Sequence, residues 1–136
     1  MKPYVSAITL GVSDVERAKQ FYGEGLGWPV QQEHGDWVAF SLGDGASMLG
    51  IYPRSALADD AGVDSDGNGF SGITLSYLVR SEERVAAVLA EAERAGGRIV
   101  RPAEAAPWGG SSGHFADPEG YVWKVASGTG QQPFAE

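Results

Sequence analysis

The sequence contains no cysteine and no long apolar run. Because none of its 136 residues is cysteine, disulfides, thiolate metal sites and cysteine nucleophiles are excluded. No apolar run approaches the roughly 20 residues that a membrane-spanning helix needs. The first residues lead directly into a strand pattern, without the apolar core of a signal peptide. We therefore expect a cytoplasmic protein with no membrane partner.

Positive charge is also scarce. Ten Lys and Arg residues face 18 Asp and Glu residues, which gives a formal net charge of −8. This balance argues against a nucleic-acid partner and weakly favours a cationic ligand, although solubility alone would explain it. The 43% share of hydrophobic residues is enough for a real core, in one domain or in two small modules that share a core.

The same order of elements is predicted twice. In the first copy, alternating apolar residues predict a strand over residues 4–12, and Ser13 with Glu16 forms a capping-box pattern for a helix from Asp14 to Gly23. Three strands follow at residues 28–32, 37–42 and 47–52, the last two joined by a turn at residues 43–45. The second copy has a strand over 70–79, a helix capped by Ser81 and ended by Gly96, a strand over 98–103 and a final hairpin. A repeat of this length indicates two modules.

The predicted organisation is a first module over residues 1–54, an acidic Gly/Asp-rich linker over 55–70, a second module over 71–128 and a tail over 129–136. Residues 64–69 match the first half of a calcium-binding loop. The twelfth position of that loop is Leu75, where a bidentate Glu belongs. A solvated turn is therefore the better interpretation.

The final hairpin carries the strongest local pattern. Residues 113–120 read Gly-His-Phe-Ala-Asp-Pro-Glu-Gly, which predicts a strand ending at Ala116, a tight turn, and a strand from Tyr121 to Ala126. Together with Ile-Thr-Leu-Gly-Val-Ser-Asp at residues 8–14, this sequence resembles the vicinal oxygen chelate superfamily. That superfamily includes glyoxalase I, the extradiol dioxygenases, fosfomycin-modifying enzymes and the bleomycin resistance proteins. The resemblance implies an α+β fold of two tandem βαβββ modules, whose curled mixed sheets form concave pockets, usually in a homodimer.

Enzymes that share this resemblance hold one divalent metal ion with His, Gln or Glu ligands. The corresponding positions here are Ala7, Leu49 or Gly50, Thr74, and Lys124. None supplies a carboxylate or an imidazole, and the ammonium of Lys124 would repel a cation. We therefore expect no metal and no cofactor.

Strand parity predicts which other side chains face the pocket. The candidate ligand-binding residues are Trp37, Ser41, Thr74, Ser76, Trp108, His114 and Lys124. Indoles beside small residues suit a large planar ligand. Each of these residues also has a plainer explanation: Trp37 could pack in a dimer interface, Trp108 could anchor its glycine loop, His114 could be an ordinary strand residue, and Lys124 could extend to solvent.

Three functions remain open from the sequence. The leading hypothesis is a metal-free binding protein, similar to the bleomycin resistance proteins, that sequesters a bulky aromatic or cationic natural product or antibiotic for self-resistance. The second is a glyoxalase-like lyase or dioxygenase with an atypical or metal-independent site, in which His114 and Lys124 could act as an acid/base pair. The third is a structural or regulatory homodimer without a small ligand.

Overall fold

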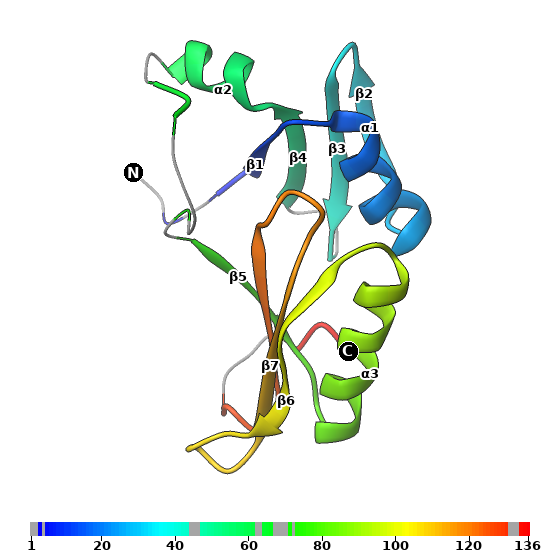
Figure 1. Cartoon of the computed structure of the whole chain (residues 1–136), viewed down its shortest axis with the longest axis vertical. Helices are drawn as coiled ribbons and strands as arrows, with labels where there is room; N and C mark the ends of the chain where they lie inside the picture. Colours follow the sequence, from blue (N-terminus) through cyan, green and yellow to red (C-terminus); the bar gives the residue numbers. More distant parts are fainter. Residues whose placement is uncertain are drawn as a thin grey trace. The chain divides into compact units, whose positions relative to one another are not determined.

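The computed structural model describes residues 3, 5–43, 47–61, 64–66, 71, 73–130 and 134–136 of the chain (Figure 1). The chain divides into two units, Met1–Asn68 and Gly69–Glu136. The predicted turn at residues 44 and 45, the start of the strand predicted from Phe70, and positions 67–69 of the calcium-like segment lie outside the described residues.

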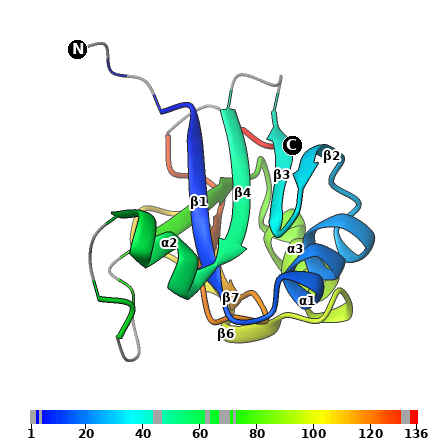
Figure 2. The ribbon, with the colours of Figure 1, turned by 90° about the horizontal axis from the view of Figure 1, so that it is seen from above.

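The first unit is a four-stranded mixed sheet with helical segments. Its elements are β1 (Ala7–Val12), α1 (Val15–Lys19), the π-helical segment η1 (Gln20–Gly25), β2 (Val30–His34), β3 (Trp37–Leu42), β4 (Ser47–Pro53) and α2 (Arg54–Ala61). The strand order is β1-β4-β3-β2, in which β1 runs parallel to β4 and the other pairs are antiparallel (Figure 2). Tyr22 of η1 packs against Phe40 of β3 with ring centroids 6.0 Å apart, so Phe40 marks the helix-covered face of this sheet.

The second unit repeats this arrangement. Its elements are β5 (Thr74–Leu78), α3 (Glu82–Arg94), β6 (Arg98–Ala105), β7 (Ser111–Ala116) and β8 (Val122–Ala126). The strand order is β5-β8-β7-β6, again with its first pair parallel. The repeated topology confirms the predicted α+β class and the two βαβββ modules.

The start of the first helix differs from the prediction. Asp14, not Ser13, is the N-cap: its backbone is extended and its Oδ1 accepts the backbone N–H of Arg17 at 3.0 Å. A carboxylate is a strong acceptor at the positive end of a helix, so the cap lies one residue after the predicted Ser13. The helix also continues past Gly23, because α1 passes into η1, which ends at Gly25.

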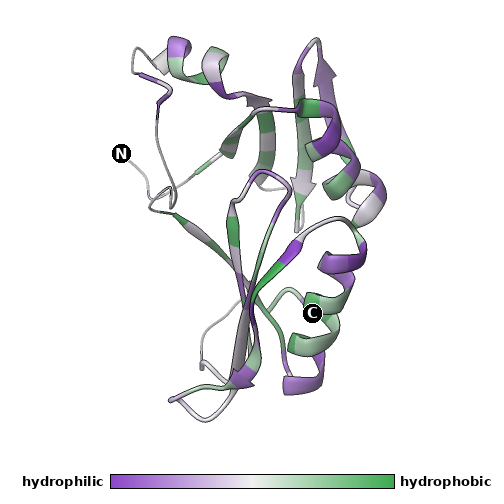
Figure 3. Ribbon diagram, viewed as in Figure 1, coloured by the Kyte–Doolittle hydropathy of each residue, from purple (hydrophilic) through white to green (hydrophobic). Residues whose placement is uncertain are grey.

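The helix of the second unit follows the prediction. The Ser81 hydroxyl accepts the backbone N–H of Arg84 at 3.2 Å, and Gly96 ends the helix with a φ of 111°. Its apolar stripe faces the sheet, and Figure 3 shows the opposite side of α3 as largely hydrophilic. The buried residues of this stripe are Val85, Val88, Leu89 and Ala92.

Helix α2 was not predicted from the sequence. It begins directly after Pro53, and its sequence, Arg-Ser-Ala-Leu-Ala-Asp-Asp-Ala, consists mostly of short and polar side chains. Because so few apolar residues mark one face, hydrophobic periodicity does not reveal this helix. Its first residue, Arg54, lies where a Cβ on Gly11 of β1 would project, 3.1 Å from the Arg54 Cα.

Among the described residues, we find no helix that combines the length and the apolar composition needed to cross a membrane.

Candidate functional site

The turn between β7 and β8 sets the register of the second unit's central strands. Asp117 is 3% exposed, and its Oδ1 accepts the backbone N–H groups of Glu119 and Tyr121, both at 2.9 Å. Gly120 closes the turn with a φ of 93°, which glycine adopts without strain. The result is a rigid hairpin in which His114 pairs directly with Lys124.

We call the side of each sheet turned away from α1 or α3 its far face. In the second unit, a Cβ on Gly113 would lie 2.5 Å from the Leu89 side chain of α3, so Gly113 faces the helix. Its neighbour His114 therefore points to the far face, because side chains alternate along a strand.

The strand pairing places four side chains in one row across the far face of the second sheet. Ser76 of β5 pairs with Lys124 of β8, Lys124 pairs with His114 of β7, and His114 pairs with Arg101 of β6. Directly paired residues of neighbouring strands project to the same face. We refer to Ser76, Lys124, His114 and Arg101 as the cross-strand row.

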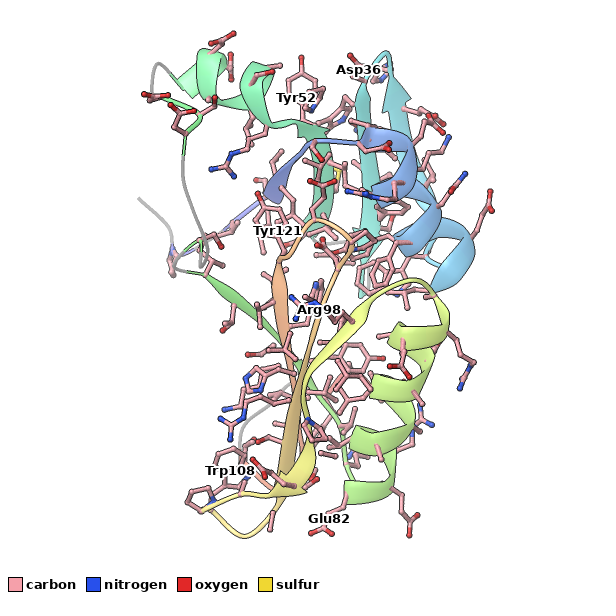
Figure 4. The ribbon with its side chains drawn as sticks, viewed as in Figure 1. Asp36, Tyr52, Glu82, Arg98, Trp108 and Tyr121 are labelled. Carbon is pink, nitrogen blue, oxygen red and sulfur yellow. The ribbon has the colours of Figure 1, made fainter. Side chains whose placement is uncertain are left out.

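Trp108 lies beside this row, in the loop between β6 and β7. Figure 4 shows Trp108 at one end of these strands, on the side away from α3. Its indole N–H donates a hydrogen bond of 2.8 Å to the Ser127 carbonyl, and the Lys124 ammonium lies 4.7 Å from the centre of its ring. A cation at this distance is attracted to the ring face.

Two glycines allow the Trp108 loop to approach β8. A Cβ on Gly110 would lie 2.0 Å from the Ser127 carbonyl oxygen, and Gly109 has a φ of 101°. The position of the indole is therefore fixed by backbone packing and by its own hydrogen bond, whatever the conformation of Lys124.

The surroundings of His114 disfavour its charged form. Burial lowers the pKa of His114 below its usual value of 6.5, and the charges of Lys124 and Arg101 lower it further. Its Nδ1 is buried and has no hydrogen-bond partner among the described residues. A buried polar atom of this kind costs free energy unless it finds a hydrogen-bond partner.

In the first unit, the Trp37 indole covers a position that the resemblance assigns to a metal ligand. Gly50 pairs with Thr9 and with Ala39, which makes it the counterpart of Lys124 in the repeated topology. A Cβ on Gly50 would lie only 2.2 Å from the Trp37 ring. The Trp37 side chain therefore fills the space into which a ligand at position 50 would project.

The pairing also resolves the choice between Leu49 and Gly50. Leu49 pairs with Phe40 on the helix-covered face and is 1% exposed, so it belongs to the core. Of these two residues of β4, Gly50 is the one on the far face. The Trp37 ring also contacts Tyr52 edge-on, with centroids 6.1 Å apart, and its N–H donates to Gln32 Oε1 at 3.4 Å.

The predicted ligand-binding residues fall into two groups. Ser76, Trp108, His114 and Lys124 come together in the second unit, and Thr74 lies two residues from Ser76 on β5. Trp37 and Ser41 belong to β3 of the first unit, where the Ser41 hydroxyl is 3.1 Å from Gln31 Oε1. Their role in ligand binding remains a prediction.

Sequence reasoning missed Arg101. A bulge in β6 between Ile99 and Arg101 shifts the register of Arg101 against β7, and a second bulge follows between Arg101 and Glu104. Simple alternation from Arg98 therefore gives the wrong face for Arg101. The basic residues on the paired strands are a sequence signal for this row, but the bulges cannot be read from the sequence.

The residues present do not fit a divalent metal ion. The positions that the resemblance assigns to metal ligands are Ala7, Gly50, Thr74 and Lys124. In that order, they carry a methyl group, no side chain, a hydroxyl and an ammonium. Oxygen or imidazole donors must converge on such an ion. Within the described part of the chain, no three His, Asp or Glu side chains come together in this way.

The chain is similar to known proteins in family, sequence and structure. A family model described as the Glyoxalase/Bleomycin resistance protein/Dioxygenase superfamily matches residues 4–125. A curated protein of Caenorhabditis elegans named Glyoxalase 1 is 28% identical over 98 residues, which are 72% of this chain but 32% of the relative. The chain thus spans about a third of the length of that relative.

Among solved structures, a glyoxalase-related enzyme from Fulvimarina pelagi is 34% identical, with a TM-score of 0.83 over 93% of this chain and 88% of the other. A lactoylglutathione lyase from Agrobacterium tumefaciens has a TM-score of 0.72 at 18% identity, covering 97% of this chain and 100% of that one. The second likeness shows the fold alone.

Proposed function

The chain belongs to the glyoxalase/bleomycin resistance protein/dioxygenase superfamily, and we propose that it binds a bulky aromatic small molecule through its side chains, without a divalent metal. In this proposal the protein acts by sequestration: it holds the compound and keeps it from its target, in the manner of a bleomycin resistance protein.

The observation that carries the proposal is the packing of Trp37 over Gly50. The closest indole carbon would lie 2.2 Å from a Cβ at position 50, so no metal-binding side chain fits there without displacing the indole. The corresponding position of the second unit presents the Lys124 ammonium. One position thus offers a flat apolar ring and the other a hydrogen-bond donor, which are contacts for an organic ligand.

Each unit, taken by itself, has aromatic area that suits a planar ligand. Trp37 and Tyr52 lie together in the first unit, and Trp108 of the second unit is 41% exposed despite its size. Large aromatic side chains bury much apolar surface at little conformational cost, so they commonly form the walls of binding sites.

Tryptophan fluorescence tests this function. Chelator-treated protein is titrated with polycyclic aromatic compounds and glycopeptide antibiotics, and we expect quenching that saturates at micromolar concentration. Trp37→Ala and Trp108→Ala should each weaken binding. Trp28→Phe is the matched control, because Trp28 packs against Tyr22 with centroids 5.4 Å apart. The proposal is overturned if no compound in the panel gives saturable quenching, or if both alanine variants bind with unchanged affinity.

A metal-independent enzyme is the second candidate. It is favoured by His114, which pairs with Lys124 and whose Nδ1 has no hydrogen-bond partner among the residues that the structure describes. Histidine is the side chain that most often acts as a general acid or base. If His114→Gln leaves ligand affinity intact while abolishing a chemical change in the bound compound, the protein is an enzyme and sequestration is wrong.

A further inference from the structure

The cross-strand row is positively charged in an acidic protein. Lys124 and Arg101 flank His114 on neighbouring strands, whereas the whole chain has a net charge of −8. Neighbouring strands lie about 4.8 Å apart, so the backbone positions of Lys124 and Arg101 are separated by about 10 Å. Side chains as long as Lys and Arg can close on a small group held between them, above the imidazole.

Within the described residues, the Lys124 ammonium forms no salt bridge. Its cation–π contact is with the face of Trp108, 4.7 Å from the ring centre. An indole face attracts a cation but leaves its N–H donors available. Lys124 can therefore donate hydrogen bonds to a ligand without breaking an ion pair.

Arg101 retains donor capacity as well. Its Nη2 lies 2.8 Å from Glu104 Oε1, but the two side chains are 65% and 58% exposed. An exposed pair of this type is weak, and a guanidinium has five N–H donors of which one contact uses few. Glu104 compensates part of the charge, so the row keeps a net positive charge centred on Lys124.

His114 supplies the second, independent observation. Its buried Nδ1 lacks a hydrogen-bond partner among the described residues. In the tautomer that carries its proton on Nδ1, the imidazole can donate a hydrogen bond. With Lys124 on one side and Arg101 on the other, an acceptor that carries negative charge is favoured.

We propose that the ligand carries an oxyanion (a carboxylate, sulfonate or phosphate), which binds on the cross-strand row between Lys124 and Arg101 while its aromatic part lies against Trp108. This inference rests on the proposed function and specifies its ligand class. A cationic ligand, which the overall charge weakly favoured, would be repelled here, because the local charge of the row is opposite to the charge of the whole chain.

Three naphthalene probes of nearly equal size test the inference: 2-naphthoate, neutral 2-naphthamide and the cation 2-naphthylmethylammonium. Affinities are measured by calorimetry with chelator present and ionic strength fixed. One charge-assisted hydrogen bond corresponds to a factor of about 10 or more in affinity, so naphthoate should bind at least about 10-fold more tightly than the amide.

Two variants locate the effect. Lys124→Gln should remove the preference for naphthoate over naphthamide. Arg94→Gln, in the last turn of α3 behind the other face of the sheet, removes the same charge and should keep the preference. A parallel NMR titration with sodium sulfate follows the His114 ring, which should shift in wild type and not in Lys124→Gln.

The outcomes separate the two proposals. If naphthoate and naphthamide bind equally well, or the cation binds best, the oxyanion inference is overturned while the proposed aromatic binding stands. If no naphthalene binds but sulfate shifts His114 in a Lys124-dependent way, the anion site stands and aromatic binding falls. If neither naphthalenes nor sulfate bind, both are wrong.

Discussion

Replacing Gly50 with alanine tests the packing that underlies the proposed function. The new Cβ would lie 2.2, 2.6 and 3.1 Å from three carbons of the Trp37 ring, where ordinary contacts are 3.4–4 Å. The indole must therefore move by more than an ångström. That movement disturbs its edge contact with Tyr52 and its hydrogen bond to Gln32.

The expected cost follows from overpacking. Inserting a methyl group into a well-packed site costs about 1–3 kcal/mol of the free energy of unfolding. For a chain of this size, 1 kcal/mol corresponds to about 4 °C in Tm, so Gly50→Ala should lower Tm by roughly 4–12 °C.

The assay is thermal unfolding combined with the Trp37 emission spectrum, obtained as the difference from a Trp37→Phe protein. Gly23→Ala is the control, since its Cβ would lie 3.5 Å from Phe40, an ordinary contact. We expect a loss of stability and a shifted Trp37 emission in Gly50→Ala alone. Equal stability of the two variants with unchanged emission would refute the packing of Trp37 over Gly50.

Three further results are expected. The pKa of His114 lies below its usual value of 6.5, because burial and two adjacent cations disfavour the imidazolium. The unfolded state therefore binds more protons, and the stability of the fold decreases as the pH drops below 6.5. An NMR titration that gives a His114 pKa of 6.5 or higher contradicts this. Burial and, second, the hydrogen bond to Glu136 raise the pKa of Tyr77 to about 12, so the contribution of Tyr77 to stability is lost as the pH rises from 10 toward 12. An absorbance titration of Glu136→Gln should give a lower Tyr77 pKa. An unchanged pKa in this variant would be evidence against the role of Glu136. A Cβ on Gly113 would lie 2.5 Å from a core leucine of α3, so Gly113→Ala should lose about 1–3 kcal/mol in urea unfolding, and a loss near zero would contradict the assigned facing of β7.

The sequence predicts best where the signal is local. The turn at residues 117–120 depends on proline and glycine at fixed positions, and the cap of α3 depends on one serine. Both are found where they were predicted, because the chemistry that fixes them lies within a few residues. Asp14 shows the limit of such signals, since two adjacent residues could each cap α1 and only the backbone geometry distinguishes them.

Features that depend on pairing could not be read from the sequence. The choice between Leu49 and Gly50 was settled by the register of β3 against β4. Arg101 belongs to the cross-strand row because of the bulge in β6 between Ile99 and Arg101. These are relations between strands, and a one-residue change of register reverses the face of every side chain.

The packing of Trp37 is the clearest case of this kind. The sequence shows a tryptophan on one strand and a glycine on another, 13 residues later. Nothing local connects them. Only the pairing of β3 with β4 shows that the missing side chain of Gly50 makes room for the indole.

The central claim is that this chain binds its ligand without a divalent metal, and direct metal binding tests it. Purified protein is dialysed to equilibrium against micromolar Mn²⁺, Fe²⁺, Ni²⁺ or Zn²⁺, and the bound metal per chain is measured by mass spectrometry. Because Ala7, Gly50, Thr74 and Lys124 offer no converging carboxylate or imidazole donors, we expect far less than one ion per chain, with ligand affinity unaffected by the metal. Stoichiometric binding of any of these ions, with ligand affinity that depends on it, would contradict the claim.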